Sequence, residues 1–192
     1  DEVASTNDLA RELADEGESA GLFVAAARQT AGRGRHGRVW QSPPGNLYCS
    51  LILRPGRPAA ETPSLSLVVA LALAEAIEDL SFGTVRPQVK WPNDVLADGA
   101  KLAGILLEGA ADRRGGRLSV VVGIGVNTDW KMSDFPWSIS PTMNSLRELA
   151  GKRPIDNDAL LEAFLDRLEP RYEALRGGQF DAGGWSKAQR TT

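Results

Sequence analysis

Three arginines alternate with glycines in one short stretch, Gly32-Arg33-Gly34-Arg35-His36-Gly37-Arg38, and Trp40 follows it closely. Glycine lets backbone amides approach an anion, and a guanidinium group donates paired hydrogen bonds to phosphate or carboxylate oxygens. The stretch therefore predicts a loop that binds an anion.

The glycine spacing fits neither of two common phosphate motifs. Gly32, Gly34 and Gly37 satisfy G-x-G-x-x-G, but the two prolines within 39–46 cannot open the helix that a dinucleotide site requires. Arg38 also stands where a P-loop needs lysine. Two other interpretations stay open, namely a solvated basic loop and a nucleic-acid-binding loop, and the net charge of -3 argues against the second.

A second group of chemically capable side chains is Lys90-Trp91-Pro92-Asn93-Asp94. A proline that interrupts the strand pattern leaves a kink, where a cation, an amide and a carboxylate stand together. Asp94 could hold a magnesium ion or orient an incoming amine. Ordinary turn chemistry is the alternative.

Small residues in two predicted strands indicate close approach of another group to the backbone. Gly104 follows Lys101 in one strand, which would let a flat ligand lie against the sheet beside a cation. Gly123 and Gly125 stand in another strand that leads to Asn127. We expect both strands to line a site.

The single histidine and the single cysteine exclude several kinds of site. His36 alone cannot build a multi-histidine metal site, and its place among arginines predicts an exposed loop residue. Cys49 stands in an apolar strand, which is typical of a core residue, so a covalent enzyme intermediate is not expected.

Length and composition predict one soluble domain. The chain has 192 residues, of which 42% are hydrophobic and 24% charged. The longest apolar stretch, 65–77, is too short to span a bilayer and contains Glu75. A lone cysteine and the absence of a leader sequence predict a cytoplasmic protein without disulfides.

Hydrophobic periodicity and turn residues predict the elements that position these groups. Helices are expected from Ser5 to Gly17 and over 62–80, 145–150 and 157–176. Strands are expected over 22–28, 47–53, 89–96, 101–109 and 118–126, the last three being joined by Asp98-Gly99 and by a turn over 113–116. The fold class is α+β, a mostly antiparallel mixed sheet flanked by helices.

In their order, these segments resemble the catalytic domain of the biotin protein ligase family. Ser5-Thr6-Asn7, Gln29 and the 45–48 segment match the same family pattern, and the resemblance runs from about residue 1 to 127 and more loosely beyond. It implies a class II synthetase-like biotin/lipoate ligase catalytic domain over 1–176. It also implies that 177–192 leads toward a C-terminal β domain, which we expect to be absent here. Many family members carry an N-terminal helix-turn-helix, which we likewise do not expect before Asp1.

The resemblance implies an ATP-dependent, AMP-forming ligase. Such an enzyme activates biotin as biotinyl-5'-AMP and transfers it to a lysine of a biotin carboxyl carrier protein, with Mg²⁺ accompanying ATP. Neither nucleic acid nor a membrane is expected as a partner, and a homodimer is left open. A lipoate or octanoate ligase or transferase of the same fold and a non-catalytic biotin sensor remain alternatives.

The site residues follow from matching positions of the family pattern. Catalytic roles are implied for Arg33, Arg35, Lys101, Lys90 and Asp94, with Asp94 as the candidate metal ligand through Mg-ATP. Biotin is expected to contact Ser5, Thr6, Asn7, Gln29, Arg33, Gly34, Arg35, Lys101, Gly104 and Ile105. The nucleotide is expected to contact Arg35, Arg38, Trp40, Asn46, Asn93, Lys101 and Asn127.

Overall fold

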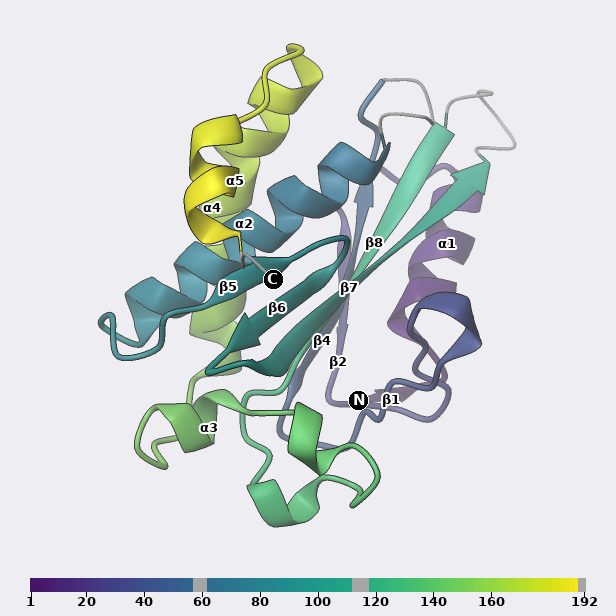
Figure 1. Ribbon diagram of the computed structural model, residues 1–192. Helices are drawn as coiled ribbons and strands as arrows, with labels where there is room; N and C mark the ends of the chain where they lie inside the picture. Colours follow the sequence, from purple (N-terminus) through teal and green to yellow (C-terminus); the bar gives the residue numbers. More distant parts are fainter. Residues whose placement is uncertain (57–61, 112–117, 190–192) are drawn as a thin grey trace. The chain divides into compact units, whose positions relative to one another are not determined.

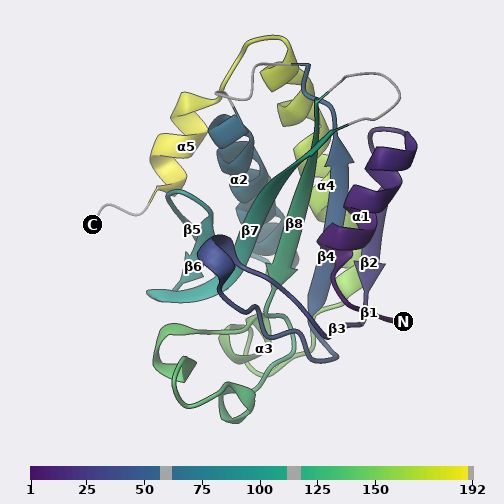
Figure 2. The same cartoon turned by 90° about the vertical axis from the view of Figure 1, so that its right-hand side faces the viewer.

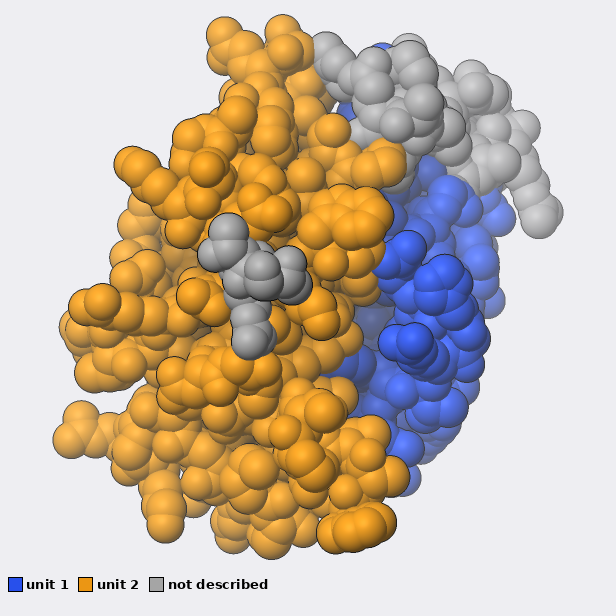
Figure 3. Space-filling model, in the orientation of Figure 1, with its two compact units in different colours: residues 1–62, 105–125 blue, residues 63–104, 126–192 orange. Residues whose placement is uncertain are grey.

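The computed structural model describes residues 1–56, 62–111 and 118–189. The chain folds into two compact units, one made of residues 1–62 and 105–125 and the other of residues 63–104 and 126–192, and Figure 3 colours them separately. The turn predicted over 113–116 lies outside the described residues.

Two sheets contain the strands that the structure describes (Figure 1). The smaller pairs β1 (Glu2–Val3) in parallel with β3 (Arg28–Gln29). The larger has the order β2-β4-β8-β7-β6-β5, and its pairings β2–β4, β5–β6 and β6–β7 are antiparallel. Its strands are β2 (Phe23–Ala26), β4 (Leu47–Leu53), β5 (Gln88–Lys90), β6 (Asp94–Ala97), β7 (Ala100–Ala111) and β8 (Leu118–Val126). The predicted α+β class is confirmed.

In the first unit, α1 (Thr6–Glu16) lies along β2 and β4 (Figure 2). The Ser5 side chain caps its first turn, and Gly17 ends it in the left-handed conformation. Its buried alanines, Ala10 and Ala14, pack with Ile52 and Val121. This packing holds α1 against β4 and β8.

The second unit holds the long helices α2 (Thr62–Leu80) and α4 (Asn157–Arg176). The predicted apolar face of α4 is confirmed, because its buried residues are Leu160, Leu161, Phe164, Leu168, Tyr172 and Leu175. Ion pairs Arg171–Glu75 and Arg167–Asp79 join α4 to α2. Shorter helices are α3 (Leu146–Leu149) and α5 (Ala182–Ala188), and α5 contacts β5. Short 3-10 turns are η1 (Arg35–Gly37), η3 (Met132–Asp134) and η4 (Ser140–Thr142).

The strand predicted over 89–96 is wrong as a single strand. It is a hairpin of β5 and β6, in which Lys90 faces Asp94 across the turn, because Pro92 has no N–H with which to continue a ladder. The strand predicted over 22–28 ends at Ala26. The Asp98-Gly99 turn is confirmed, with φ of 49° and 81°.

Candidate active site

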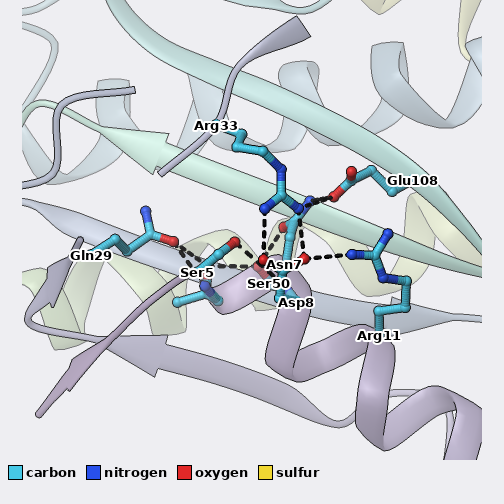
Figure 4. Close-up of polar contacts among 9 residues, drawn as sticks. Ser5, Asn7, Asp8, Arg11, Gln29, Arg33, Ser50 and Glu108 are labelled. Atoms are coloured by element: carbon cyan, nitrogen blue, oxygen red, sulfur yellow. Dashed lines mark hydrogen bonds and ion pairs between the residues drawn. The ribbon is translucent and has the colours of Figure 1, made fainter. Parts of the chain in front are cut away.

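A chain of hydrogen bonds fixes the side chain of Gln29 at the N-terminus of α1 (Figure 4). The Thr6 backbone N–H donates to Gln29 Oε1 over 2.8 Å, so Gln29 must turn its amide nitrogen the other way. Gln29 Nε2 then donates to Ser42 Oγ over 2.9 Å, and Ser42 donates to the Trp40 carbonyl over 3.0 Å. The donor and the acceptor of each of these hydrogen bonds are thereby fixed.

The Asn7 amide is fixed in the same way. Its Nδ2 donates to Glu108 Oε2 over 2.6 Å, and its Oδ1 accepts from Ser50 Oγ over 2.6 Å. Ser50 Oγ also lies 2.8 Å from Thr6 Oγ1. Asn7 and Ser50 are 5% and 0% exposed, so these groups satisfy one another away from water. Gly123 leaves the room they need, since a Cβ there would lie 2.1 Å from Asn7 Oδ1.

The Arg33 guanidinium lies between two carboxylates of its own unit (Figure 4). It pairs with both oxygens of Asp8 over 2.6 and 2.8 Å, and it reaches Glu108 Oε2 over 3.4 Å. The hydrogen bond from Arg33 lowers the pKa of Asp8, against the opposing effect of burial. The same bond raises the pKa of Arg33. Arg33 is thus a permanently charged and firmly held cation.

The glycine-rich segment is a narrow loop that closes on itself. Trp40 N–H donates to the Gly32 carbonyl over 2.9 Å and Gly34 N–H to the Arg38 carbonyl over 2.7 Å. Arg35 and Arg38 are exposed at the tip, as is His36, whose exposure was predicted. Gly34 has room for a side chain, because the nearest atom to its ideal Cβ is 3.6 Å away.

At Gly32 and Gly125 another group of the protein lies where a side chain would begin. A Cβ on Gly32 would lie 2.5 Å from Ser42 Oγ, and one on Gly125 would lie 2.4 Å from Trp40 Nε1. The predicted close approach to Gly123 and Gly125 is therefore confirmed. The groups that approach are Asn7 and Trp40 of the same unit.

In the second unit, Lys101 and Asp94 form an ion pair. Lys101 Nζ on β7 lies 2.7 Å from Asp94 Oδ1 on β6, and Gly104 is the register partner of Asp94. The two side chains are 25% and 24% exposed. Lys90 is exposed and Asn93 half-buried in the adjoining hairpin.

Asn127 fastens the segment after β8 to the start of β7. Its backbone N–H donates to the Leu102 carbonyl over 3.0 Å, and its Nδ2 donates to the Asn144 carbonyl over 3.1 Å. The Asn144 N–H donates in turn to the Lys101 carbonyl over 2.9 Å. The loop after Asn127 is therefore held beside the strand that carries Lys101.

Several predicted residues lie within the core. Ile105 and Asn46 are 2% and 3% exposed. Burial raises the pKa of Cys49 to about 12, so this thiol cannot supply a thiolate near neutral pH, as its apolar strand predicted. The Tyr48 hydroxyl donates to the Pro43 carbonyl over 2.8 Å, and burial raises its pKa as well.

The first unit gathers Ser5, Thr6, Asn7, Gln29 and Arg33, and the second pairs Lys101 with Asp94. Four partners of the first group were not predicted, namely Asp8, Ser42, Ser50 and Glu108. Two of them carry a signal that could have been used. Ser50 and Glu108 stand within apolar strands, where a polar side chain needs a partner.

The described residues contain neither a cluster of metal-binding side chains nor a membrane-spanning helix. No three side chains of the metal-binding types His, Cys, Asp and Glu come close enough together there to hold an ion. None of the helices described has the length and hydrophobicity to cross a membrane.

Comparison with known proteins identifies the family. The model of the biotin/lipoate A/B protein ligase family matches residues 2–127. The biotin–[acetyl-CoA-carboxylase] ligase of Paracoccus denitrificans is 48% identical over 184 residues, which are 95% of this chain and 73% of that protein. The bifunctional ligase/repressor BirA of Bacillus subtilis (strain 168) is 41% identical over 173 residues, 90% of this chain. The chain spans about half of the BirA protein, 52% of its length.

A solved structure of a biotin protein ligase has a similar fold. The biotin protein ligase from Aquifex aeolicus, in complex with biotin and ATP, superposes with a TM-score of 0.85 at 31% identity, covering 98% of this chain and 75% of that one. Because the family model covers well over half of the chain, the chain belongs to the biotin/lipoate A/B protein ligase family, and within it resembles the biotin protein ligases.

Proposed function

We propose that this chain activates biotin with ATP as biotinyl-5'-AMP and transfers the biotinyl group to a lysine of a biotin carboxyl carrier protein. The observation that carries the proposal is the buried set of oriented hydroxyl and amide groups around the N-terminus of α1. A biotin–[acetyl-CoA-carboxylase] ligase and a ligase that binds biotin and ATP, each similar over nearly the whole chain, support it.

The biotin head group is assigned to Ser5, Thr6, Asn7 and Gln29. A ureido ring offers one carbonyl acceptor and two N–H donors, which hydroxyl and amide side chains complement. These side chains are held in fixed orientations by protein partners, as the Gln29 and Asn7 bonds illustrate. Fixed partners reduce the entropy lost on binding. Gly34, Gly104 and Ile105 are the proposed walls of this site.

In the activation step, a biotin carboxylate oxygen attacks the α-phosphorus of ATP and pyrophosphate leaves. The carboxylate is already a nucleophile, so the protein has to position it and neutralise the negative charge on the oxygens of the α-phosphate. We assign Arg33, Arg35, Lys90 and Lys101 to that charge, with Mg²⁺ entering as part of the ATP substrate. The proposed nucleotide contacts are Arg38, Trp40, Asn46, Asn93 and Asn127.

In the transfer step, a lysine amine of the carrier attacks the acyl carbon and AMP leaves. Free lysine has a pKa of about 10.4, so the amine has to be positioned and relieved of a proton. Asp94 is the carboxylate assigned to this task. Its ion pair with Lys101 holds it in one place.

Exchange of radioactive pyrophosphate into ATP tests the activation step without the carrier. We expect exchange that depends on biotin, and we expect Lys101→Ala to reduce it by at least a hundredfold, the scale of one lost oxyanion contact, about 2.7–4 kcal/mol. Exchange that depends on lipoate but not on biotin would instead assign the chain to the lipoate branch of the family. No exchange with either acid would refute a ligase.

A further inference from the structure

We propose that Glu108 is a positioning residue, which acts on the ligand through Asn7 and Arg33. Its Oε2 accepts from Asn7 Nδ2 over 2.6 Å and lies 3.4 Å from an Arg33 nitrogen. One carboxylate oxygen thus restrains the amide assigned to the biotin head group and a cation assigned to the phosphate charge in the activation step. This inference rests on the proposed function.

The first action is to fix which way the Asn7 amide points. An ionised carboxylate only accepts hydrogen bonds, so Asn7 has to present its nitrogen to Glu108 and its oxygen to Ser50. A glutamine at position 108 would satisfy either orientation, since it carries both a donor and an acceptor. The negative charge, and not only the shape of the side chain, therefore orients Asn7.

The second action concerns Arg33, which Glu108 shares with Asp8. The short bidentate pair to Asp8 supplies most of the restraint, and the contact with Glu108 places the guanidinium near Asn7 as well. In the part of the chain that the structure describes, the Asp8 side chain bonds to Arg11 and Arg33 and not to Asn7. A substitution of Asp8 therefore affects only the restraint on Arg33, whereas a substitution of Glu108 also affects the orientation of Asn7.

Glu108 is not an isolated surface acid. It lies on β7 with its side chain 24% exposed, while the residues it touches, Asn7 and Arg33, stand at sequence distances of 101 and 75. A carboxylate held against an otherwise apolar strand costs desolvation energy, which the bonds to these two partners offset.

Glu108→Gln is the test, with pyrophosphate exchange and titration calorimetry with biotin as readouts. We expect the KM and Kd for biotin to rise on the order of tenfold, the loss of one oriented hydrogen bond, while the melting temperature stays within a few degrees. Asp8→Asn should lower kcat and leave the biotin KM unchanged. The matched control is Asp79→Asn, which makes the same change in an ion pair between α2 and α4.

A double-mutant cycle with Asn7→Ala separates positioning from structural support. If Glu108 acts through Asn7, Glu108→Gln adds little to the biotin Kd once Asn7 is removed. Additive losses, an unchanged Kd in Glu108→Gln, or a loss that only follows a lower melting temperature would overturn the inference. Wild-type protein that binds no biotin would refute the proposed function instead.

Discussion

Gly123 is the residue on which the position of the Asn7 amide most directly depends. Its ideal Cβ would lie 2.1 Å from Asn7 Oδ1, too close for any unshifted side chain. We expect Gly123→Ala to displace this amide, to weaken biotin binding at least tenfold, and to cost about 1–3 kcal/mol of unfolding free energy through overpacking. Calorimetry and urea denaturation measure these two effects.

Gly183 supplies the control for that substitution. It lies in α5, and the nearest atom to its ideal Cβ is 3.7 Å away, at Asp181 Oδ1. Gly183→Ala should leave biotin binding unchanged and stabilise the helix by up to about 1 kcal/mol. Equal biotin affinity in the two variants would show that Asn7 does not need its present position.

Asp8 gives the Arg33 ion pair a pH dependence of known sign. Because its pKa is lowered in the folded protein, the pair stabilises the fold above the unfolded pKa, near 3.8, and the benefit disappears as pH falls through the folded value. Asp8 is one-third exposed, so we expect Asp8→Asn to cost about 1 kcal/mol or less at pH 7. In urea titrations the cost should shrink as the pH is lowered below 3.8. A cost independent of pH would contradict the ion-pair explanation.

At the scale of elements, two ion pairs join α4 to α2 and differ in burial. Arg171–Glu75 has side chains 22% and 30% exposed, and Glu75 Oε2 and Arg171 Nε have no hydrogen-bond partner in the part of the chain that the structure describes. Arg167–Asp79 is about half exposed. Arg171→Met leaves the Glu75 carboxylate without its ion-pair partner, so it should lower the free energy of unfolding by about 1–3 kcal/mol. Arg167→Met should lower it by less than about 1 kcal/mol.

The double variant Glu75→Leu/Arg171→Met completes this comparison. Replacing a partly buried pair with apolar side chains removes two desolvation costs together, so we expect unfolding free energy close to that of the wild type. Urea denaturation of the four proteins measures the differences. Equal losses from Arg171→Met and Arg167→Met would show that burial does not separate the two pairs.

Local sequence patterns predict the elements that have a clear hydrophobic period. The bounds of β4, β8 and α4 were predicted to the residue, because strand and helix periodicity and end signals lie in contiguous sequence. The β1–β3 pairing was not predicted, since two-residue strands leave no period to detect. Nor was α5, whose AGGWSKA sequence holds two poor helix formers.

The candidate site was predicted by residue type but not by partner. The resemblance selected Asn7 and Arg33, yet their bonds to Glu108 span 101 and 75 residues of sequence. Such pairs depend on the register of strands and on the docking of α1, which periodicity does not encode. The apolar neighbours of Ser50 and Glu108 signal only that each needs a partner, without naming it.

For the whole molecule, ligand binding should appear as added thermal stability. A ligand at a hundred times its Kd adds about 2.7 kcal/mol, which for a chain of this size raises the melting temperature by roughly 5–10 °C. We expect biotin and ATP each to raise it, as measured by scanning calorimetry. An oligonucleotide should not, given the net charge of -3.

Biotin and ATP together should raise the melting temperature by more than the sum of their separate effects. The adenylate joins both groups in one molecule, so the second group binds without a further loss of translational freedom. The α,β-methylene analogue of ATP cannot release pyrophosphate, and with biotin it should give a shift near the sum. Gly123→Ala should reduce the biotin shift while keeping that of ATP. If ATP and its analogue gave equal shifts with biotin, the bound state would be a ternary complex without chemistry, and the proposed activation of biotin would fail at its first step.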